Sequence, residues 1–327
     1  MRRRDFISLV GGSAVAWPLA ARAQQQPMPV VAFVNAGVAD ASAGRVAAFR
    51  KGLSESGYVE GQNVKVEYYW LEGHYDRIPA LVADLVRRGV AVIASPANPQ
   101  VALAAKAVTS SVPIVFGVGE DPVRLGLVAS LARPGGNATG INFFNSEVAG
   151  KRLGLLHELV PHAARIAVLV NPGNPGSIDI LRDVQEAARL LGLQILVFNA
   201  GTSAEIDTAF AAIARARADA LFVAGDVFFN SRRVQLVTLA ARDRLPASYA
   251  SREYVEAGGL MNYATNLLDM FRQVGVYTGS IIKGTKPADL PVMQASKFEF
   301  LINLQTAKAL GIEVPPTLLA RADEVIE

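Results

Sequence analysis

The sequence predicts an α/β fold of two lobes, each built on a small doubly wound parallel sheet. Short β-branched runs alternate with longer segments of helical periodicity, which is typical of parallel strands linked by helices. The same order of elements begins a second time near residue 166. A chain of 327 residues that is 51% hydrophobic is also long enough for more than one typical domain core.

The first half of the chain predicts strands and helices in alternation. Residues 30–34 form the first expected strand, and a helix over 43–56 follows with Gly57 as its C-cap. We then expect, in order, a strand over 64–69, a helix over 78–88, a strand over 90–94, a helix over 101–108, a strand over 114–116 and a strand near 139–143. All these strands are short and apolar, so we expect helices on both faces of the sheet.

The second half repeats this pattern at a slowly drifting offset. A Val-Asn-x-Gly segment ends a strand at Asn35 and again at Asn171, 136 residues later. Three further pairs keep the same order: Gly57 with Gly192, Val112-Pro113 with Leu245-Pro246, and, more loosely, residues 140–142 with 259–262. We therefore interpret the chain as two similar lobes, with a first crossing near residues 143–147 before a helix over 146–159.

The amino terminus predicts an export signal. Residues 1–23 combine a basic start, an apolar stretch over 6–19 and the small-residue ending Ala21-Arg22-Ala23, a pattern typical of a secretory signal peptide cleaved after about Ala23. The run over 3–7 resembles the twin-arginine motif, and an ordinary Sec signal is the alternative. No cysteine follows for a lipid anchor, so we expect a periplasmic protein that is not itself anchored to the membrane.

The charge balance argues against a nucleic-acid partner. The whole chain has 32 basic and 29 acidic side chains, but four arginines and one aspartate belong to residues 1–23, which leaves 28 of each sign. The basic excess therefore belongs to the export signal. The chain has no cysteine, and its three histidines show no metal-binding spacing, so we expect neither a cofactor nor a metal.

Polar residues at the carboxyl ends of the expected strands are the candidates for ligand binding, because ligands of open parallel sheets bind there. Helix starts after Ser42, Asn98 and Asn230 could receive a carboxylate. Asp121 or Asp226 could pair with an ammonium group, and aromatic rings could cover an apolar body. The ten candidates are Asn35, Ser42, Ser95, Asn98, Asp121, Asn171, Asp226, Phe228, Asn230 and Tyr249. This set suits a small zwitterion, although such residues also cap helices.

Catalytic alternatives have less support in the sequence. There is no Gly-x-Ser-x-Gly elbow, and no histidine follows an expected strand where it could serve a serine as base. Residues 117–119 lack the third glycine of a dinucleotide fingerprint, and residues 279–286 carry a phosphate-loop spacing in the wrong order at a helix end. An α/β enzyme therefore remains a weaker alternative to a binding protein.

Several long gapless motifs resemble one family. They are PIVF over 113–116, GLVASLARPGGNATG over 126–140, AGGLM over 257–261, KGTKPADLPV over 283–292 and NLQTAKALG over 303–311. Together they resemble the ABC-transporter substrate-binding proteins related to the tryptophan/tyrosine-binding type, over nearly the whole mature chain. The resemblance implies a two-lobed fold of the type I periplasmic-binding-protein kind with a three-segment hinge. It places residues 28–143 and 264–285 in lobe 1, and 144–263 and 286–327 in lobe 2.

The same resemblance implies a function. It implies a monomeric periplasmic receptor that closes on a small organic solute and delivers it to an ABC permease in the inner membrane; a ligand sensor for a membrane receptor is the alternative. Where this type carries Thr-Pro-x-Ala-Gln, the chain has Ser95-Pro96-Ala97-Asn98-Pro99-Gln100, which keeps a hydroxyl and alters a helix start. An amino acid and another aromatic or branched carboxylate are both compatible with these residues.

Overall fold

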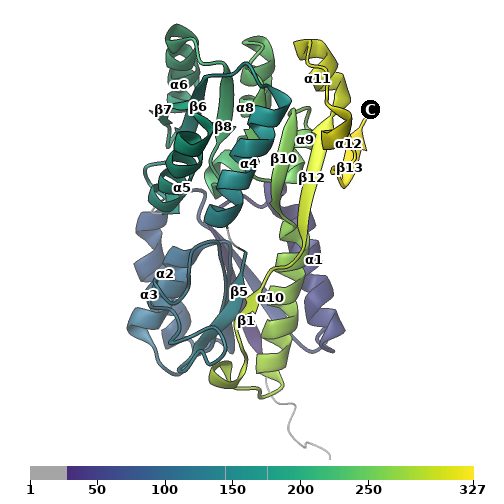
Figure 1. Cartoon of the computed structure of the whole chain (residues 1–327). Coiled ribbons are helices and arrows are strands. Elements are labelled where there is room, and N and C mark those ends of the chain that lie inside the picture. Colours follow the sequence, from purple (N-terminus) through teal and green to yellow (C-terminus); the bar gives the residue numbers. More distant parts are fainter. Residues whose placement is uncertain (1–27, 144, 175) are drawn as a thin grey trace, which may run out of the picture.

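Two α/β lobes, one above the other, make up the described part of the chain (Figure 1). The structure is a computed structural model that describes residues 28–143, 145–174 and 176–327. The expected signal peptide lies outside these residues. Each lobe has a central sheet between two layers of helices, as the alternating pattern predicts.

The sheet of lobe 1 is entirely parallel, because helices carry the chain back after each strand. Its strand order is β11-β5-β4-β3-β1-β2. The strands are β1 Val30–Asn35, β2 Lys65–Trp70, β3 Val92–Pro96, β4 Ile114–Val118, β5 Ala138–Asn142 and β11 Met293–Gln294.

Alternate residues of these strands enter two separate cores. Val31 and Phe33 pack under α1 (Ala43–Glu55) and α10 (Leu267–Ile282), whereas Ala32 and Val34 pack under helices on the opposite face. Those helices are α2 Ile78–Arg87 and α3 Pro99–Val108. Short 3-10 turns complete the lobe: η1 Asp40–Ser42, η2 Tyr75–Arg77 and η3 Pro287–Asp289.

Lobe 2 has a sheet of the same kind with one reversed strand. Its order is β13-β12-β10-β9-β8-β6-β7, and β12 runs antiparallel to β10. The reversal follows from the path of the chain, since β12 enters this lobe from the hinge. The strands are β6 Arg165–Val170, β7 Gln194–Asn199, β8 Ala220–Val223, β9 Ala247–Tyr249, β10 Met261–Thr265, β12 Phe298–Asn303 and β13 Glu324–Ile326.

The helices of lobe 2 also cover both faces of its sheet. α4 and α5 lie with α11 and α12 over one core, and α6 and α8 lie over the other. Their bounds are α4 Asn145–Leu159, α5 Gly176–Leu191, α6 Ser203–Ala216, α7 Val227–Ser231, α8 Arg233–Arg242, α9 Arg252–Glu256, α11 Leu304–Leu310 and α12 Pro316–Leu319.

Three crossings join the lobes, and the third lies later than the expected boundary at residue 286. Met293–Gln294 pairs with β5 in lobe 1, so the chain enters lobe 2 only between Gln294 and Phe298. The reason is burial: Val292 belongs to a lobe 1 core, and Leu290 O accepts a hydrogen bond from Thr139 Oγ1 at 2.6 Å. The second crossing follows Thr265, which still pairs with β12.

Candidate ligand-binding cleft

A cleft with about 870 Å³ of empty space lies between the lobes, and residues of both lobes line it. It lies at the carboxyl ends of β3, β4, β8 and β9, where open parallel sheets bind their ligands. Lobe 1 contributes Arg45, Tyr75, Ala97, Pro99, Gln100 and Glu120. Lobe 2 contributes Arg152, Asp226, Asn230, Ser251, Tyr254 and Tyr263.

Asp226 is one of the two predicted residues that line the cleft. It is the N-cap of α7, and its Oδ1 accepts hydrogen bonds from Phe229 N at 3.1 Å and Asn171 Nδ2 at 3.2 Å. Its Oδ2 accepts a bond from Asn174 Nδ2 at 2.9 Å. Burial raises the pKa of Asp226 above the usual aspartate value, although these hydrogen bonds act in the opposite direction.

Asn230 is the other predicted residue in the cleft wall. It is buried, and its Oδ1 accepts a hydrogen bond from Ser251 Oγ at 3.1 Å. Ser251 also lines the cleft, so the ends of α7 and β9 are joined there. The pair presents small polar groups next to Asp226.

Four predicted residues of lobe 1 lie behind the cleft wall rather than in it. Asn35 donates from Nδ2 to Pro96 O at 3.2 Å, and Ser42 donates from Oγ to Val38 O at 2.9 Å. Asn98 is the N-cap of α3, where its Oδ1 accepts from Val101 N at 3.4 Å, and Ser95 is buried in β3. Of these four, Asn35 and Asn98 hold the backbone that places Ala97, Pro99 and Gln100 in the cleft.

The remaining predicted residues lie elsewhere. Asp121 is exposed and accepts a hydrogen bond from Val123 N at 2.8 Å, which makes it a turn former. Asn171 and Phe228 line a second, more open hollow beside the cleft, which shares Tyr75 with it. Tyr249 is fully buried and stacks on Tyr254 with ring centroids 4.6 Å apart, so it supports the cleft from below.

Sequence reasoning missed the two arginines of the cleft, Arg45 and Arg152. Both lie inside predicted helices, where charged residues are usually solvated. A signal was present for Arg152, because it lies on the apolar face of α4 that Val148, Leu155 and Leu159 define at helical spacing. A lone arginine on such a face has to be explained by a buried partner or by a ligand.

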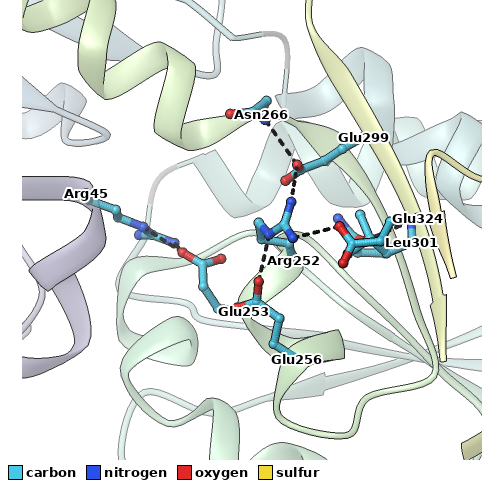
Figure 2. Close-up of polar contacts among 9 residues, drawn as sticks. Arg45, Arg252, Glu253, Glu256, Asn266, Glu299, Leu301 and Glu324 are labelled. Carbon is cyan, nitrogen blue, oxygen red and sulfur yellow. Dashed lines mark hydrogen bonds and ion pairs between the residues drawn. The ribbon is translucent and has the colours of Figure 1, made fainter. Parts of the chain in front are cut away.

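The charge of Arg45 is balanced by a carboxylate of the other lobe. It lies on α1 of lobe 1, and its Nε and Nη2 donate to Glu253 Oε1, on α9 of lobe 2, at 3.1 and 2.9 Å (Figure 2). Burial alone would raise the pKa of Glu253, but the charge of Arg45 and the hydrogen bonds from Ser251, Arg45 and the Glu253 backbone together hold that pKa below the usual value. The ion pair therefore links the two lobes at the rim of the cleft.

Arg152 has no such partner. Its side chain is 2% exposed, its Nη2 donates to Val223 O at 2.8 Å, and its Nε has no hydrogen-bond partner. The guanidinium carbon lies 4.0 Å from the centre of the Phe222 ring. Burial lowers the pKa of Arg152 to about 9, which leaves it charged at neutral pH.

Within residues 28–143, 145–174 and 176–327, no group of three or more His, Asp or Glu side chains is arranged to hold a metal ion. In that same part of the chain, no helix has both the length and the apolar character needed to cross a membrane.

Comparison with known proteins identifies one family. The profile of a family described as "ABC transporter substrate binding protein" matches residues 28–326. The curated "Tyrosine-binding protein" of Clostridioides difficile (strain R20291) is 26% identical over 265 residues, which cover 81% of this chain and 76% of that protein.

Two solved structures show the same fold. An ABC domain in complex with L-Trp from Streptococcus pneumonia matches with a TM-score of 0.82 at 25% identity, over 91% of this chain and 99% of that one. The ligand-free, open structure of a substrate-binding protein with adhesive properties from Clostridium difficile matches with a TM-score of 0.64 at 23% identity, over the same shares.

Proposed function

The chain belongs to the family of ABC transporter substrate-binding proteins, and from this premise we propose that it captures an amino acid in the cleft between its lobes. It then delivers that amino acid to a membrane permease. Closure of the lobes is a hinge equilibrium that the ligand biases through contacts made only in the closed state. The protein makes and breaks no bond in this role.

The observation that carries the proposal is the half-buried carboxylate of Asp226 in the cleft wall. Its three hydrogen bonds come from uncharged amide groups, two of them from Asn171 and Asn174. A buried carboxylate is stabilised far more by a cation than by neutral donors. The α-ammonium group of an amino acid would supply that cation.

Aromatic rings support an aromatic amino acid as the ligand. Tyr75, Phe143, Tyr254 and Tyr263 all line the cleft, and rings of this kind cover apolar bodies by offset or edge contacts. The tyrosine-binding relative and the L-Trp complex point to the same class. The chain has Asn98-Pro99 where the tryptophan/tyrosine type usually has Ala-Gln. Because of this difference, a branched amino acid is the second choice of ligand.

A binding screen tests the proposal. Purified protein from Gln24 onward is heated with L-Trp, L-Tyr, L-Phe, L-Leu and their deaminated acids, and the shift in Tm is recorded. A ligand at 100 times its Kd stabilises the folded protein by about 2.7 kcal/mol. We expect an aromatic amino acid to give the largest shift. No shift with any amino acid, or chemical turnover of a ligand that binds, contradicts the proposal.

Asp226→Asn provides the residue-level test. The amide keeps an oxygen for Phe229 N but removes the negative charge. We expect it to weaken binding of the amino acid by about 10- to 150-fold, since hydrogen bonds to charged groups are worth about 1.5–3 kcal/mol, and to leave the deaminated acid within about threefold. Isothermal titration measures both constants. Equal losses for the two ligands would show that Asp226 does not bind an ammonium group.

Export is part of the same proposal. Residues 1–23 act as a signal, of the twin-arginine kind, that is removed after about Ala23. The mature protein then works in the periplasm. Mass spectrometry of protein recovered from the periplasmic fraction should give an N-terminus at Gln24, and replacing both Arg3 and Arg4 by Lys should abolish export. Continued export of that variant would favour the Sec route.

A further inference from the structure

Two arginines line the cleft, and they differ in one respect. Arg45 is paired with Glu253, so its charge is already balanced within the protein. Arg152 lies within ion-pair distance of no carboxylate among the described residues, and its Nε donates to nothing. It is therefore the cation in the cleft wall that can still receive an anion.

The surroundings of Arg152 show that its charge is not held there by solvent. The side chain is 2% exposed and lies against the Phe222 ring, and its one hydrogen bond goes to a neutral carbonyl, Val223 O. A guanidinium offers five N–H donors, and burying a charged group without an anion is costly. Fold stability alone would favour an apolar side chain at this place in α4.

On the basis of the proposed function, we infer that Arg152 receives the carboxylate of the ligand, so that this receptor selects free carboxylic acids over amines, esters and sugars. Arginine suits this role, because its planar fork matches both oxygens of a carboxylate. The assignment adds a second charge to the recognition by Asp226 and defines the chemical class of the ligand.

Arg152 and Asp226 both reach the cleft at the end of β8. Arg152 donates to the carbonyl of Val223, and Asp226 follows Val223 by only three residues at the same end of β8. Tyr254 also lines the cleft, and burial followed by the charge of Asp226 raises its pKa. An α-amino acid carries its carboxylate and ammonium groups on one carbon, as this arrangement requires.

The competing receptor for a carboxylate is the N-terminus of α3, which also lines the cleft. It has less to offer, because Pro99 has no N–H and the Asn98 side chain already accepts from Val101 N. Gln100, the next residue of that first turn, also lines the cleft and keeps its backbone N–H. The partial positive charge at one helix N-terminus attracts a carboxylate less strongly than a buried guanidinium that still has N–H donors without a partner.

The test separates the two charges of the ligand. Isothermal titration uses L-tryptophan, tryptamine, which lacks the carboxylate, and 3-(indol-3-yl)propionate, which lacks the ammonium group. The variants are Arg152→Met, which keeps the stem over Phe222, Arg152→Lys, which keeps a charge, and Arg242→Met as a control that removes an exposed arginine paired with Asp243. Tm values show that each variant is folded.

We expect Arg152→Met to weaken both carboxylate ligands about 100-fold and to leave tryptamine within threefold, because charge-assisted bonds are the strong ones. Arg152→Lys should retain binding within about tenfold, and Arg242→Met should change nothing. Equal losses for all three ligands would mean a structural role and overturn the inference. Unchanged carboxylate binding in Arg152→Met would assign the carboxylate to α3 and overturn it too.

The same titrations distinguish a failure of the proposed function from a failure of the role of Arg152. If the unmodified protein binds 3-(indol-3-yl)propionate or 3-phenylpropionate but no amino acid, the amino acid proposal fails while Arg152 still explains the acid. If Arg152→Met does not fold, Arg152→Lys provides the test instead. A point charge does not match both carboxylate oxygens as the arginine fork does, so the ratio of the Kd for tryptamine to the Kd for tryptophan should fall about tenfold. An unchanged preference in that variant contradicts the inference.

Discussion

Glu299 illustrates how burial sets the chemistry of single residues in this molecule. It lies on β12 just after the third crossing, and its Oε2 accepts hydrogen bonds from Asn266 Nδ2 at 3.1 Å and Arg252 Nη1 at 3.3 Å (Figure 2). Burial raises the pKa of Glu299 to about 7, although the charge of Arg252 acts to lower it. The nearby Glu253 and Glu256 add to the increase.

This pKa predicts a pH-dependent stability. The pKa of Glu299 in the folded protein lies above the ordinary glutamate value of 4.5, so the folded chain binds this proton more tightly than the unfolded chain does. The resulting stabilisation is full below about pH 4.5 and is lost as the pH rises through 7. Glu299→Gln removes the titration. We expect the free energy of unfolding of the variant, relative to the unmodified protein, to increase by about 2 kcal/mol from pH 5 to pH 8.

Urea unfolding at pH 5, 6, 7 and 8 measures this difference. The control is Glu158→Gln, which removes an exposed carboxylate that is paired with Arg321, away from Glu299. Its difference from the unmodified protein should stay level over that range. A level difference for Glu299→Gln as well would show that Glu299 titrates in the same way in the folded and unfolded chain.

At the level of elements, the packing of α1 against α10 depends on two glycines. A Cβ at Gly275 would collide with the backbone carbonyl of Phe49, and a Cβ at Gly52 would collide with that of Arg272. The helices approach closely enough for Ser56 Oγ to donate to Val276 O at 3.1 Å. This contact secures α10 to lobe 1, and α10 is the helix that follows the second crossing.

Gly275→Ala should therefore destabilise the protein, since backbone on both sides has to move apart. We expect a loss of about 2–4 kcal/mol in the free energy of unfolding, measured by urea titration. The matched control is Gly154→Ala in α4, where a Cβ meets nothing within 4 Å. That change should instead stabilise by about 0.5–1 kcal/mol, as alanine does in a helix interior. A neutral Gly275→Ala would mean that the helices separate at no cost.

At the scale of the whole molecule, ion pairs between described residues join the lobes across the cleft. Arg45 pairs with Glu253 at 2.9 Å, and Arg124 pairs with Asp179 at 2.9 Å. The first is mostly buried, with side-chain exposures of 5% and 22%, and the second is more exposed. Exposed pairs contribute about 0–1 kcal/mol, whereas breaking a buried pair leaves an uncompensated charge.

Arg45→Met should shift the hinge toward the open form. Small-angle scattering of the protein without added ligand should then show a larger radius of gyration, and ligand affinity should fall about three- to tenfold, since binding requires the closed fraction. Arg124→Met, which removes the exposed pair, should change both quantities much less. An unchanged radius of gyration in Arg45→Met would show that the pair does not hold the lobes together.

Part of the candidate site follows from residue order. Because parallel strands place their carboxyl ends at one edge, the sequence predicts the right loops, and Asp226 and Asn230 from those loops line the cleft. Asn35 and Asn98 come from the same edge yet lie behind the wall, since their side chains bond to nearby backbone. Which of these side chains line the cleft depends on hydrogen bonds that form only in the folded protein, and the order of residues along the chain does not reveal them.

The two-lobed α/β fold was readable in the chain itself, because hydrophobic periodicity and its repetition are properties of neighbouring residues. Three features required the folded molecule: the reversed strand β12, the pairing of Met293–Gln294 in lobe 1, and the isolated charge of Arg152. Each depends on groups far apart in sequence that the folded chain brings together or leaves without a partner. Local periodicity therefore accounts for the architecture, and long-range packing determines which charges the ligand meets.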